Sequence, residues 1–242
     1  MDIQLKNVNK SFDKKPVIKD MTFTIPSGDI VCLLGPSGSG KTTTIRLLIG
    51  AIAADNGEIL FGTTKVPDLK LLRSIGFMPQ NDALYDDLTG EDNLKFFSEL
   101  YGVKKGEEEK RINETLALVD LTADRKKYVK NYSGGMKKRL SLAAALLHEP
   151  DVLLLDEPTV GIDPVLRRKL WDQFKEIKKS GRTIIVSTHV MDEVSQCDKA
   201  ALIYNGNLIN YDTIDNLLAK TESGKVEDLF FKAALEKEGG KA

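Results

Sequence analysis

The segment at residues 35–42 constrains the fold more than any other part of the sequence. It reads GPSGSGKT and matches the phosphate-loop pattern GxxxxGK[ST]. The apolar run at residues 30–34 precedes it and predicts a strand covered on both faces in a parallel sheet. Ile45, Leu48 and Ile49 follow at helical spacing, and Gly50 stands where a helix C-terminal glycine would. The sequence therefore predicts a strand, a glycine-rich loop and a helix.

The chemistry of this loop favours phosphate binding. Glycines let consecutive backbone N–H groups point at phosphate oxygens, and the following helix adds its positive N-terminal end. Lys41 would reach the terminal phosphates, and the Thr42 hydroxyl would bind Mg²⁺. The alternative is a turn that only joins strand to helix, but it does not explain a lysine followed by a threonine.

Two adjacent carboxylates, Asp156 and Glu157, end a second apolar run at residues 152–155. Charges at the end of a buried strand are costly unless a cation or a reacting group uses them. We expect Asp156 to hold Mg²⁺ through its water shell and Glu157 to polarise the water that attacks the γ-phosphate. The alternative is that both charges simply reach solvent.

Two further polar residues follow expected strands or loops. His189 comes after the apolar run at residues 183–186, so it should emerge at the sheet edge where ligands of open α/β sheets gather. Gln80 follows Pro79 and, from the residues alone, is a loop glutamine. A single histidine is more often structural than catalytic, and its expected position is what favours function.

Ser133, Gly134 and Gly135 form a second glycine-bearing element. Ser133 would cap a helix whose exposed N–H groups suit an anion. A chain that already has one phosphate loop has little use for a second in the same site, so this helix end is expected to bind the nucleotide of another subunit. The alternative is an ordinary capped helix start.

The remaining pattern predicts an α/β fold. Residues 3–8 and 21–25 alternate as antiparallel strands do, and residues 83–147 are expected to form a helical insertion. Thr89 and Asp92 have the spacing of a capping box, so a helix of the insertion is expected to begin there. The runs at residues 152–155 and 183–186 predict buried strands separated by a helix, which indicates a parallel α/β core. We expect an ATPase domain at residues 1–220 and a short amphipathic tail at residues 221–242.

Composition excludes several classes of protein. The 35 Lys+Arg against 36 Asp+Glu leave a net charge of -1, so no basic field exists to hold a nucleic acid. No apolar run reaches the length of a membrane span, so the expectation is a soluble cytosolic protein. Cys32 and Cys197 lack the spacing of a zinc site or a disulfide framework and are expected to be buried thiols.

Together these motifs resemble the ABC ATPase family from Ile3 to about Leu218. The resemblance implies a P-loop NTPase (RecA-like) core with an N-terminal antiparallel β region and an inserted α-helical subdomain. It also implies ATP and Mg²⁺ as ligands. The Walker A motif of the family resembles the loop made of Gly35, Pro36, Ser37, Gly38, Ser39, Gly40, Lys41, Thr42 and Thr43. Asp156 resembles the Walker B aspartate, Glu157 the catalytic glutamate, and Gln80 the Q-loop glutamine, which serves catalysis and Mg²⁺ binding. Ser133-Gly134-Gly135 resembles the signature, Gly161-Ile162-Asp163 the D-loop with Asp163 near the nucleotide, His189 the switch histidine, and Phe12 the aromatic ring under adenine.

The signature departs from the usual family form LSGGQ at two positions. Tyr132 replaces the leucine and Met136 replaces the glutamine, so the nucleotide contact of that glutamine cannot be assigned here. The YSGGM form, the GIDP segment and the Val-Glu-Asp-Leu-Phe tail resemble the branch that serves drug, antibiotic and peptide exporters. Export is therefore favoured over import.

The resemblance implies a homodimer, or a dimer with a similar ATPase subunit, at the cytoplasmic face of the membrane. Separate transmembrane permease subunits would carry the substrate, and no nucleic-acid partner is expected. The alternatives are an importer ATPase subunit and a non-transport ABC ATPase, whose usual second cassette or inserted coiled coil is absent from this sequence. A small-molecule kinase or GTPase would not explain the Ser133 element, and a guanine-reading NKxD motif is also absent.

Two surfaces near these motifs carry further expectations. Met78, Pro79, Ala83, Leu84 and Tyr85 surround Gln80 and suit an incoming partner helix, although they would equally pack the insertion onto the core. Basic residues crowd the signature and are either a solvated face or a means of attracting the triphosphate of the facing subunit. These are Arg125, Lys126, Lys127, Lys130, Lys137, Lys138 and Arg139.

Overall fold

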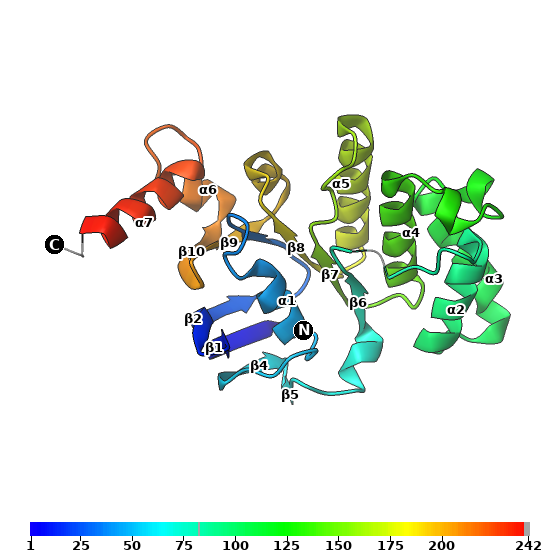
Figure 1. Cartoon of the computed structure of the whole chain (residues 1–242), viewed down its shortest axis with the longest axis horizontal. Coiled ribbons are helices and arrows are strands. Elements are labelled where there is room, and N and C mark those ends of the chain that lie inside the picture. The colour runs from blue at the N-terminus through cyan, green and yellow to red at the C-terminus, as the bar shows by residue number, and fades with distance from the viewer. Residues whose placement is uncertain (82, 240–242) are drawn as a thin grey trace. The chain divides into compact units, whose positions relative to one another are not determined.

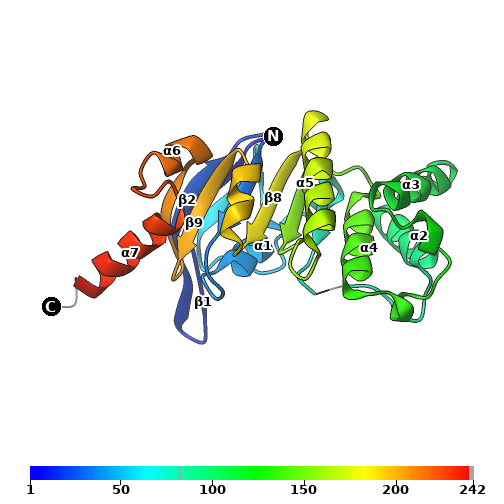
Figure 2. The same ribbon diagram turned by 90° about the horizontal axis from the view of Figure 1, so that it is seen from above.

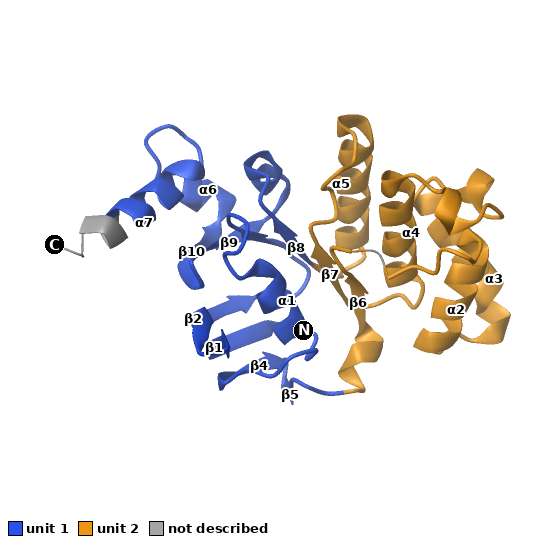
Figure 3. Ribbon diagram, in the orientation of Figure 1, with its two compact units in different colours: residues 1–68, 185–242 blue, residues 69–184 orange. Residues whose placement is uncertain are grey.

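The computed structural model describes residues 1–81 and 83–239, with side chains to Leu235, and it divides into two compact units (Figure 3). Unit 1 joins Met1–Asp68 to Ile185–Ala242, and unit 2 is the continuous segment Leu69–Ile184. The phosphate loop at residues 35–42 therefore belongs to unit 1, and the strand that ends in Asp156 belongs to unit 2. The expected division into residues 1–220 and 221–242 stays a prediction.

An antiparallel sheet opens unit 1 (Figure 1), as the alternation of its residues predicts. The side chains of Ile3, Leu5 and Val8 are buried, and Ile3 pairs with Ile25 across the sheet. Alternate residues of a strand face the same side, so one face of this sheet packs into the core. The strand order is β2-β1-β4-β5, with β1 at Ile3–Phe12, β2 at Lys15–Ile25, β4 at Asn56–Phe61 and β5 at Thr64–Lys65.

The second sheet of unit 1 carries the phosphate loop. Its central strand β3 (Ile30–Leu34) is buried along its whole length and pairs in parallel with β9. Helix α1 (Lys41–Leu48) follows the loop, and Gly50 takes φ 70 just past its end, as a helix-terminating glycine does. The order in unit 1 is β10-β9-β3-β8, with β8 at Thr183–Thr188, β9 at Lys199–Tyr204 and β10 at Asn207–Thr213.

The C-terminal segment packs onto unit 1. Val226 and Phe230 are buried in a cluster that also contains Cys32 and Leu202, so the start of the tail contributes to the core. Cys32 is buried as expected, whereas Cys197 is half-buried. A 3₁₀ helix lies at Met191–Gln196, α6 at Ile214–Leu218 and α7 at Glu227–Gly239. The last residues of the predicted tail, Gly240 to Ala242, lie outside the described residues.

The described residues of unit 2 include the parallel strands β6 and β7 and four complete α-helices. Strand β6 (Ile75–Met78) pairs in register with β7 (Val152–Asp156). Helices α2, α3 and α4 pack against one another (Figure 2). Their bounds are Gly90–Tyr101 for α2, Lys105–Leu118 for α3 and Gly134–Leu146 for α4, with α5 at Pro164–Lys179 and 3₁₀ helices at Leu71–Ser74, Thr122–Asp124 and Val129–Asn131.

Side-chain caps mark where three helices of unit 2 begin, namely α2, α4 and α5. The Thr89 hydroxyl accepts from the backbone N–H of Asp92 at 3.1 Å, which confirms the predicted helix start. Half of the capping box differs, because the Asp92 carboxylate accepts the Thr89 hydroxyl at 2.6 Å instead of the Thr89 N–H. Each cap satisfies N–H groups that have no partner inside the helix.

The α/β class predicted from the sequence is confirmed. The buried strands β7 and β8 and the intervening helix α5, with Leu170, Phe174 and Ile177 buried, lie where periodicity placed them. Strands β4, β5, β6, β9 and β10 were not predicted. In the part of the chain that the structure describes, no helix has both the length and the apolar character needed to cross a bilayer.

Candidate active site

The phosphate loop depends on glycine at three positions. Gly38 and Gly40 have φ 77 and φ 112, which L side chains rarely adopt. A Cβ atom on Gly35 would lie 2.1 Å from the carbonyl oxygen of Ile203. The first glycine therefore permits close packing on β9, and the other two permit the curl of the backbone into α1.

Lys41 is the first residue of α1, and its side chain turns back into the loop. Its ammonium donates to the carbonyl oxygens of Gly35 at 2.8 Å and Pro36 at 3.0 Å, and the residue is only 4% exposed. A buried ammonium needs such polar partners. The result is a positive charge held within a ring of backbone groups at a helix N-terminus, which is the chemistry of a phosphate site.

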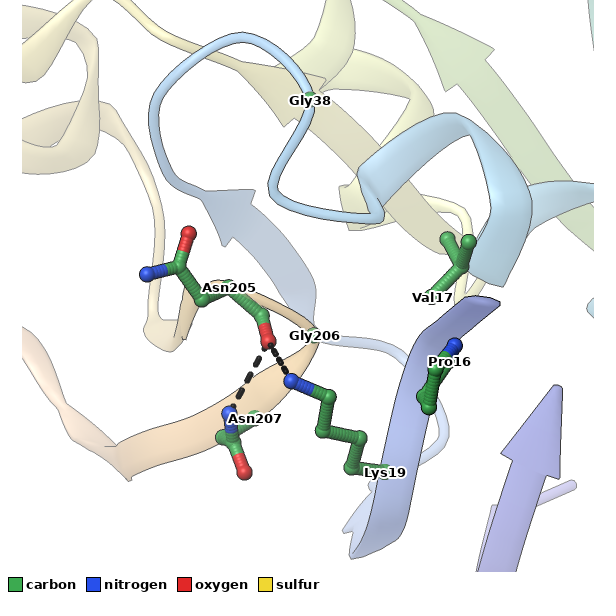
Figure 4. A pocket seen from close by; sticks show the side chains of 7 residues that line it. All are labelled: Pro16, Val17, Lys19, Gly38, Asn205, Gly206 and Asn207. Atoms are coloured by element: carbon green, nitrogen blue, oxygen red, sulfur yellow. Dashed lines mark hydrogen bonds between the residues drawn. The ribbon is translucent and has the colours of Figure 1, made fainter. Parts of the chain in front are cut away.

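The turn between β9 and β10 connects the phosphate loop to strand β2 by hydrogen bonds, and we call this connection the clip. The sequence did not reveal it. The N–H of Gly206 donates to the Ser39 carbonyl at 3.0 Å, and the Gly206 carbonyl accepts from the Lys19 N–H at 2.8 Å. The Lys19 ammonium donates to the Asn205 carbonyl at 2.9 Å (Figure 4). A pocket of about 630 Å³ lies beside the clip, lined by Pro16, Val17, Lys19, Gly38, Asn205, Gly206 and Asn207.

Phe12 lies at the end of β1 with 43% of its surface exposed. This exposure excludes the alternative that Phe12 is a core residue. The ammonium of Lys10 lies 5.5 Å from the centre of the Phe12 ring. An exposed aromatic face of this kind can stack on a planar base.

His189 directly follows β8, and its side chain is exposed. The residue before it, Thr188, offers its carbonyl to the Gly35 N–H at 3.4 Å. The Thr188 hydroxyl donates to the Glu193 carboxylate at 2.8 Å and accepts from the Val190 N–H at 3.0 Å. Unit 1 thus ties the strand end that carries His189 to the first glycine of the phosphate loop.

The two carboxylates lie at the end of β7 in unit 2. Asp156 is 1% exposed and Glu157 is 7% exposed. Glu157 has φ 51, in the left-handed region that residues other than glycine, asparagine and aspartate rarely occupy. The side-chain amide of Gln80, which follows β6, donates to a Glu157 carboxylate oxygen at 3.0 Å. The structure therefore brings together Gln80 and Glu157, two residues to which the resemblance assigns a part in the same reaction.

The signature segment caps α4. The Ser133 hydroxyl accepts from the Met136 N–H at 3.2 Å, and Gly134 and Gly135 form the first turn. Ser133 and Gly134 are exposed, whereas Tyr132 is buried and donates its hydroxyl to the Asp124 carbonyl at 2.9 Å. Burial, with the Asp124 charge, raises the pKa of Tyr132 to about 12. The tyrosine that replaces the usual leucine is therefore a neutral structural anchor.

Asp163 caps α5 in this structure. Its carboxylate accepts from the N–H groups of Val165 at 3.1 Å and Leu166 at 3.0 Å. The structural explanation for this residue is thus established, and its role near nucleotide stays a prediction.

Each unit assembles a different part of the predicted site. Unit 1 holds Phe12, the Walker A loop and His189, and unit 2 holds Gln80, Ser133, Asp156, Glu157 and Asp163. Sequence reasoning missed Lys19 and Gly206, whose contacts join distant segments. It also gave no particular role to Lys138, whose ammonium donates to the carbonyls of Gln80 at 3.3 Å and Glu157 at 3.2 Å.

Among the described residues, no group of three or more His, Cys, Asp or Glu side chains could hold a metal ion. Mg²⁺ in nucleotide sites is commonly held by one or two carboxylates together with phosphate oxygens and water. The residues expected to bind it here are a hydroxyl, an amide and a carboxylate, namely Thr42, Gln80 and Asp156. Their oxygen donors fit Mg²⁺ bound together with a nucleotide.

Known proteins are similar to this chain in sequence and in fold. The family model described as "ABC transporter" matches residues 18–160, more than half of the 242 residues. The linearmycin resistance ATP-binding protein LnrL of Bacillus subtilis is 38% identical over 221 residues, which are 90% of this chain and 71% of LnrL. The Nod factor export ATP-binding protein I of Sinorhizobium fredii is 40% identical over 210 residues, 86% of this chain and 61% of that protein.

A solved ATP-binding subunit of an ABC transporter matches with a TM-score of 0.87 at 27% identity, covering 96% of this chain and 99% of that one. A dimeric ATP-binding cassette in a post-hydrolysis state, bound to ADP and Pi, matches with a TM-score of 0.80 at 26% identity, covering 87% of this chain and 98% of that one. Both likenesses extend over nearly the whole of the solved chains.

The fold and the phosphate loop therefore define a P-loop ATPase. The chain belongs to the ABC transporter family, and it is an ATP-binding subunit of a transporter. Its relatives differ in length, since the chain spans 39% of the probable multidrug ABC transporter ATP-binding protein YbhF of Escherichia coli and about a third of two Dictyostelium discoideum ABC transporters.

Proposed function

We propose that this ATPase works as a dimer around two ATP molecules and drives export of a substrate through separate transmembrane permease subunits. The observation that carries the proposal is the buried Lys41 ammonium inside a glycine-built loop at the start of α1. It accounts for triphosphate binding, and the Gln80–Glu157 pair accounts for hydrolysis.

The proposal assigns different tasks to the two units. In unit 1, the loop from Gly35 to Thr43 binds the phosphates, Phe12 stacks under adenine and His189 senses the terminal phosphate. The N–H groups of the loop and the Lys41 ammonium stabilise the negative charge of the triphosphate. In unit 2, Glu157 accepts a proton from the attacking water, as a general base must.

Magnesium is part of the proposal because the expected ligands are oxygen donors. The Thr42 hydroxyl, Gln80 and Asp156 would hold Mg²⁺, which would neutralise charge on the phosphates. Asp156 is 1% exposed at the end of β7, and a buried carboxylate of this kind suits a cation.

The dimer explains the second anion-binding element. Ser133 is exposed at the N-terminus of α4, where Gly134 and Gly135 leave room for a ligand to approach the backbone. We assign Ser133, both glycines and Asp163 to the nucleotide of the facing subunit, related by a two-fold axis. The partner is a second copy or a similar ATPase subunit, and the dimeric state of the solved ATP-binding cassette supports this assignment.

Export is favoured by the relatives, since LnrL is named for linearmycin resistance and the Sinorhizobium protein for Nod factor export. The proposed location is the cytoplasmic face of the membrane, through contact with the permease subunits. An importer subunit and a non-transport ABC ATPase remain the competing functions. Co-purification from the native membrane, with identification of the partner, separates them.

The shared site is tested by mixing two inactive variants, Lys41→Ala and Ser133→Arg, under conditions that allow heterodimers. In the mixed dimer one composite site carries both defects and the other carries neither, so mixing should restore part of the hydrolysis. Activity should also rise with protein concentration, because ATP that touches both subunits favours the dimer by mass action.

If hydrolysis requires both sites of the dimer to be intact, mixing the two variants restores no activity even though the sites are shared. ATP-dependent dimerisation of Glu157→Gln is therefore measured alongside, by size-exclusion chromatography with light scattering. A chain that stays monomeric with ATP at every concentration, yet hydrolyses ATP at full rate, would contradict the shared site.

A further inference from the structure

Lys138 joins the two loops that carry Gln80 and Glu157. Its ammonium donates to the carbonyl oxygen of Gln80 at 3.3 Å and to that of Glu157 at 3.2 Å. Hydrogen bonds from a charged donor are stronger than those between neutral groups. One side chain therefore holds the backbone on both sides of the Gln80–Glu157 contact.

The backbone that Lys138 holds is not in a relaxed conformation. Glu157 has φ 51, and a non-glycine residue keeps such a conformation only where its surroundings impose it. The Glu157 carbonyl also accepts from the Val160 N–H at 3.4 Å. Lys138 is thus one of the groups that fix the direction of the Glu157 side chain.

Lys138 lies on the same helix as the signature. It is five residues after Ser133, about 7.5 Å along the axis of α4 at the helical rise of 1.5 Å per residue. A helix moves as a rigid element over so short a distance, so a displacement at Ser133 is carried to the Lys138 backbone. The contacts of Lys138 then pass that displacement to Gln80 and Glu157.

We propose that Lys138 is a positioning residue that links the Ser133 end of α4 to the Gln80–Glu157 pair, so that nucleotide contact at Ser133 sets the geometry of hydrolysis at Glu157 in the same chain. This inference rests on the proposed roles of Ser133 and Glu157. It goes beyond them by making the two ATP sites of a dimer communicate through a single side chain of each subunit.

The neighbouring Lys137 provides a matched control. It lies on the same turn of α4 and pairs with Asp86 instead of with Gln80 or Glu157. Lys137→Met removes the same charge from the same helix and leaves the contacts of Lys138 in place. A general effect of charge on this surface would therefore appear in both variants.

The test compares Lys138→Met, Lys138→Arg and Lys137→Met in the full chain. We expect Lys138→Met to lower kcat about tenfold, as the loss of a charged hydrogen bond predicts, with the Kd for ATP changed by less than about twofold. Lys138→Arg should recover kcat to within about threefold, and Lys137→Met should stay within about twofold of the parent chain. Thermal unfolding of each variant shows whether the fold is retained, and Lys138→Gln replaces Lys138→Met if the latter does not fold.

A double-mutant cycle tests the link itself. If Lys138 carries the effect of Ser133, the fold loss of kcat in the double variant should be smaller than the product of the losses in Ser133→Ala and Lys138→Met. The difference should be more than about threefold. Multiplicative losses, an unchanged kcat in Lys138→Met, or an equal loss in Lys137→Met would each overturn the proposal. Failure of the proposed shared site looks different, because the parent chain would then stay monomeric with ATP at every concentration, whatever the effect of the Lys138 variants.

Discussion

The amide nitrogen of Gln80 lies 3.0 Å from a carboxylate oxygen of Glu157 and donates a hydrogen bond to it. The two residues follow neighbouring parallel strands, β6 and β7, which explains how positions 77 residues apart come together. This pair makes the roles of both residues testable by substitutions that keep their shape.

Glu157→Gln should retain ATP binding and lose ATP hydrolysis. The amide oxygen that replaces one carboxylate oxygen can still accept from Gln80, so the shape survives, but the side chain no longer takes a proton. We expect steady-state ATPase activity to fall by at least about 100-fold, the scale of general base catalysis, with little change in the Kd for ATP. Near-normal activity in a coupled phosphate-release assay would disprove the assignment.

A control is available at Glu149, which also lies in unit 2 and also has a positive φ, of 52. It is exposed and pairs with Arg111 and Arg182. Glu149→Gln should leave ATPase activity within about twofold, since pairs of this kind contribute little.

Gly206→Ala should weaken ATP binding. Gly206 has φ 80, and a Cβ atom there would lie 2.3 Å from the Val17 carbonyl, so the clip that holds Ser39 would have to open. We expect the Kd for ATP to rise about tenfold, because a loop that is less pre-organised binds phosphate less tightly. Isothermal titration of nucleotide into the variant measures the change.

Gly224→Ala is a control that separates the effect of backbone strain from the effect of the Cβ contact with the Val17 carbonyl in Gly206→Ala. Gly224 has φ 73, and nothing lies within 4 Å of the position its Cβ would take. Both variants strain the backbone by about 1–2 kcal/mol. A rise in the Kd for ATP that is equal in the two variants would therefore rule out the clip as its cause.

The surface near Gln80 can be tested by adding charge. Met78 is buried and so belongs to the core, whereas Tyr85 is 48% exposed and its ring lies 4.8 Å from that of Phe96, which is 40% exposed. Leu84→Asp should abolish co-purification with the membrane subunit and leave ATP binding intact, because the new charge would be buried in the interface.

Leu84 is itself half-buried, so Phe96→Asp serves as a second variant that an exposed site should tolerate. Unfolding of Leu84→Asp alone, with normal association of Phe96→Asp, would favour the view that these residues only pack the helices. Unaltered association of two folded variants would refute the interface.

The stability of unit 2 should fall as the pH is lowered below about 6.5, the ordinary pKa of histidine. Burial lowers the pKa of His148, and the charge of Arg111 adds to this effect. Below pH 6.5 the unfolded chain binds a proton that the folded chain does not, so His148 contributes stability above that pH and loses it as the pH falls. His148→Phe should flatten this part of the profile of urea unfolding against pH. The new ring can keep the stack on Tyr101, whose centroid lies 4.0 Å away.

The sequence predicted the elements whose signal is local. The loop at residues 35–42, the caps at Thr89 and Ser133, and the buried strands β7 and β8 follow from patterns within a few residues, and all were placed correctly. The family and the ATPase activity followed from the order of motifs.

What the sequence could not show depends on contacts between distant segments. Gly206 meets Ser39, and Lys138 meets Gln80, but neither has a local pattern that distinguishes it from a turn glycine or a surface lysine. Strands such as β4 and β5 are short or exposed, so their alternation is weak. The nucleotide role proposed for Asp163 also has no local signal, since the same carboxylate is a good helix cap.

The interrupted sequence of unit 1 has a consequence for protein synthesis. Unit 2 is one continuous segment, whereas the neighbour of β3 in its sheet, β9, comes more than 160 residues later in the chain. The ribosome therefore releases all of unit 2 before the phosphate loop acquires the strand on which Gly35 packs. Arrested nascent chains of increasing length should bind immobilised ATP only after Gly206 has left the exit tunnel, and binding by a shorter chain would contradict this order. A newly made subunit would thus remain unable to engage nucleotide until β9 and the turn after it have been made.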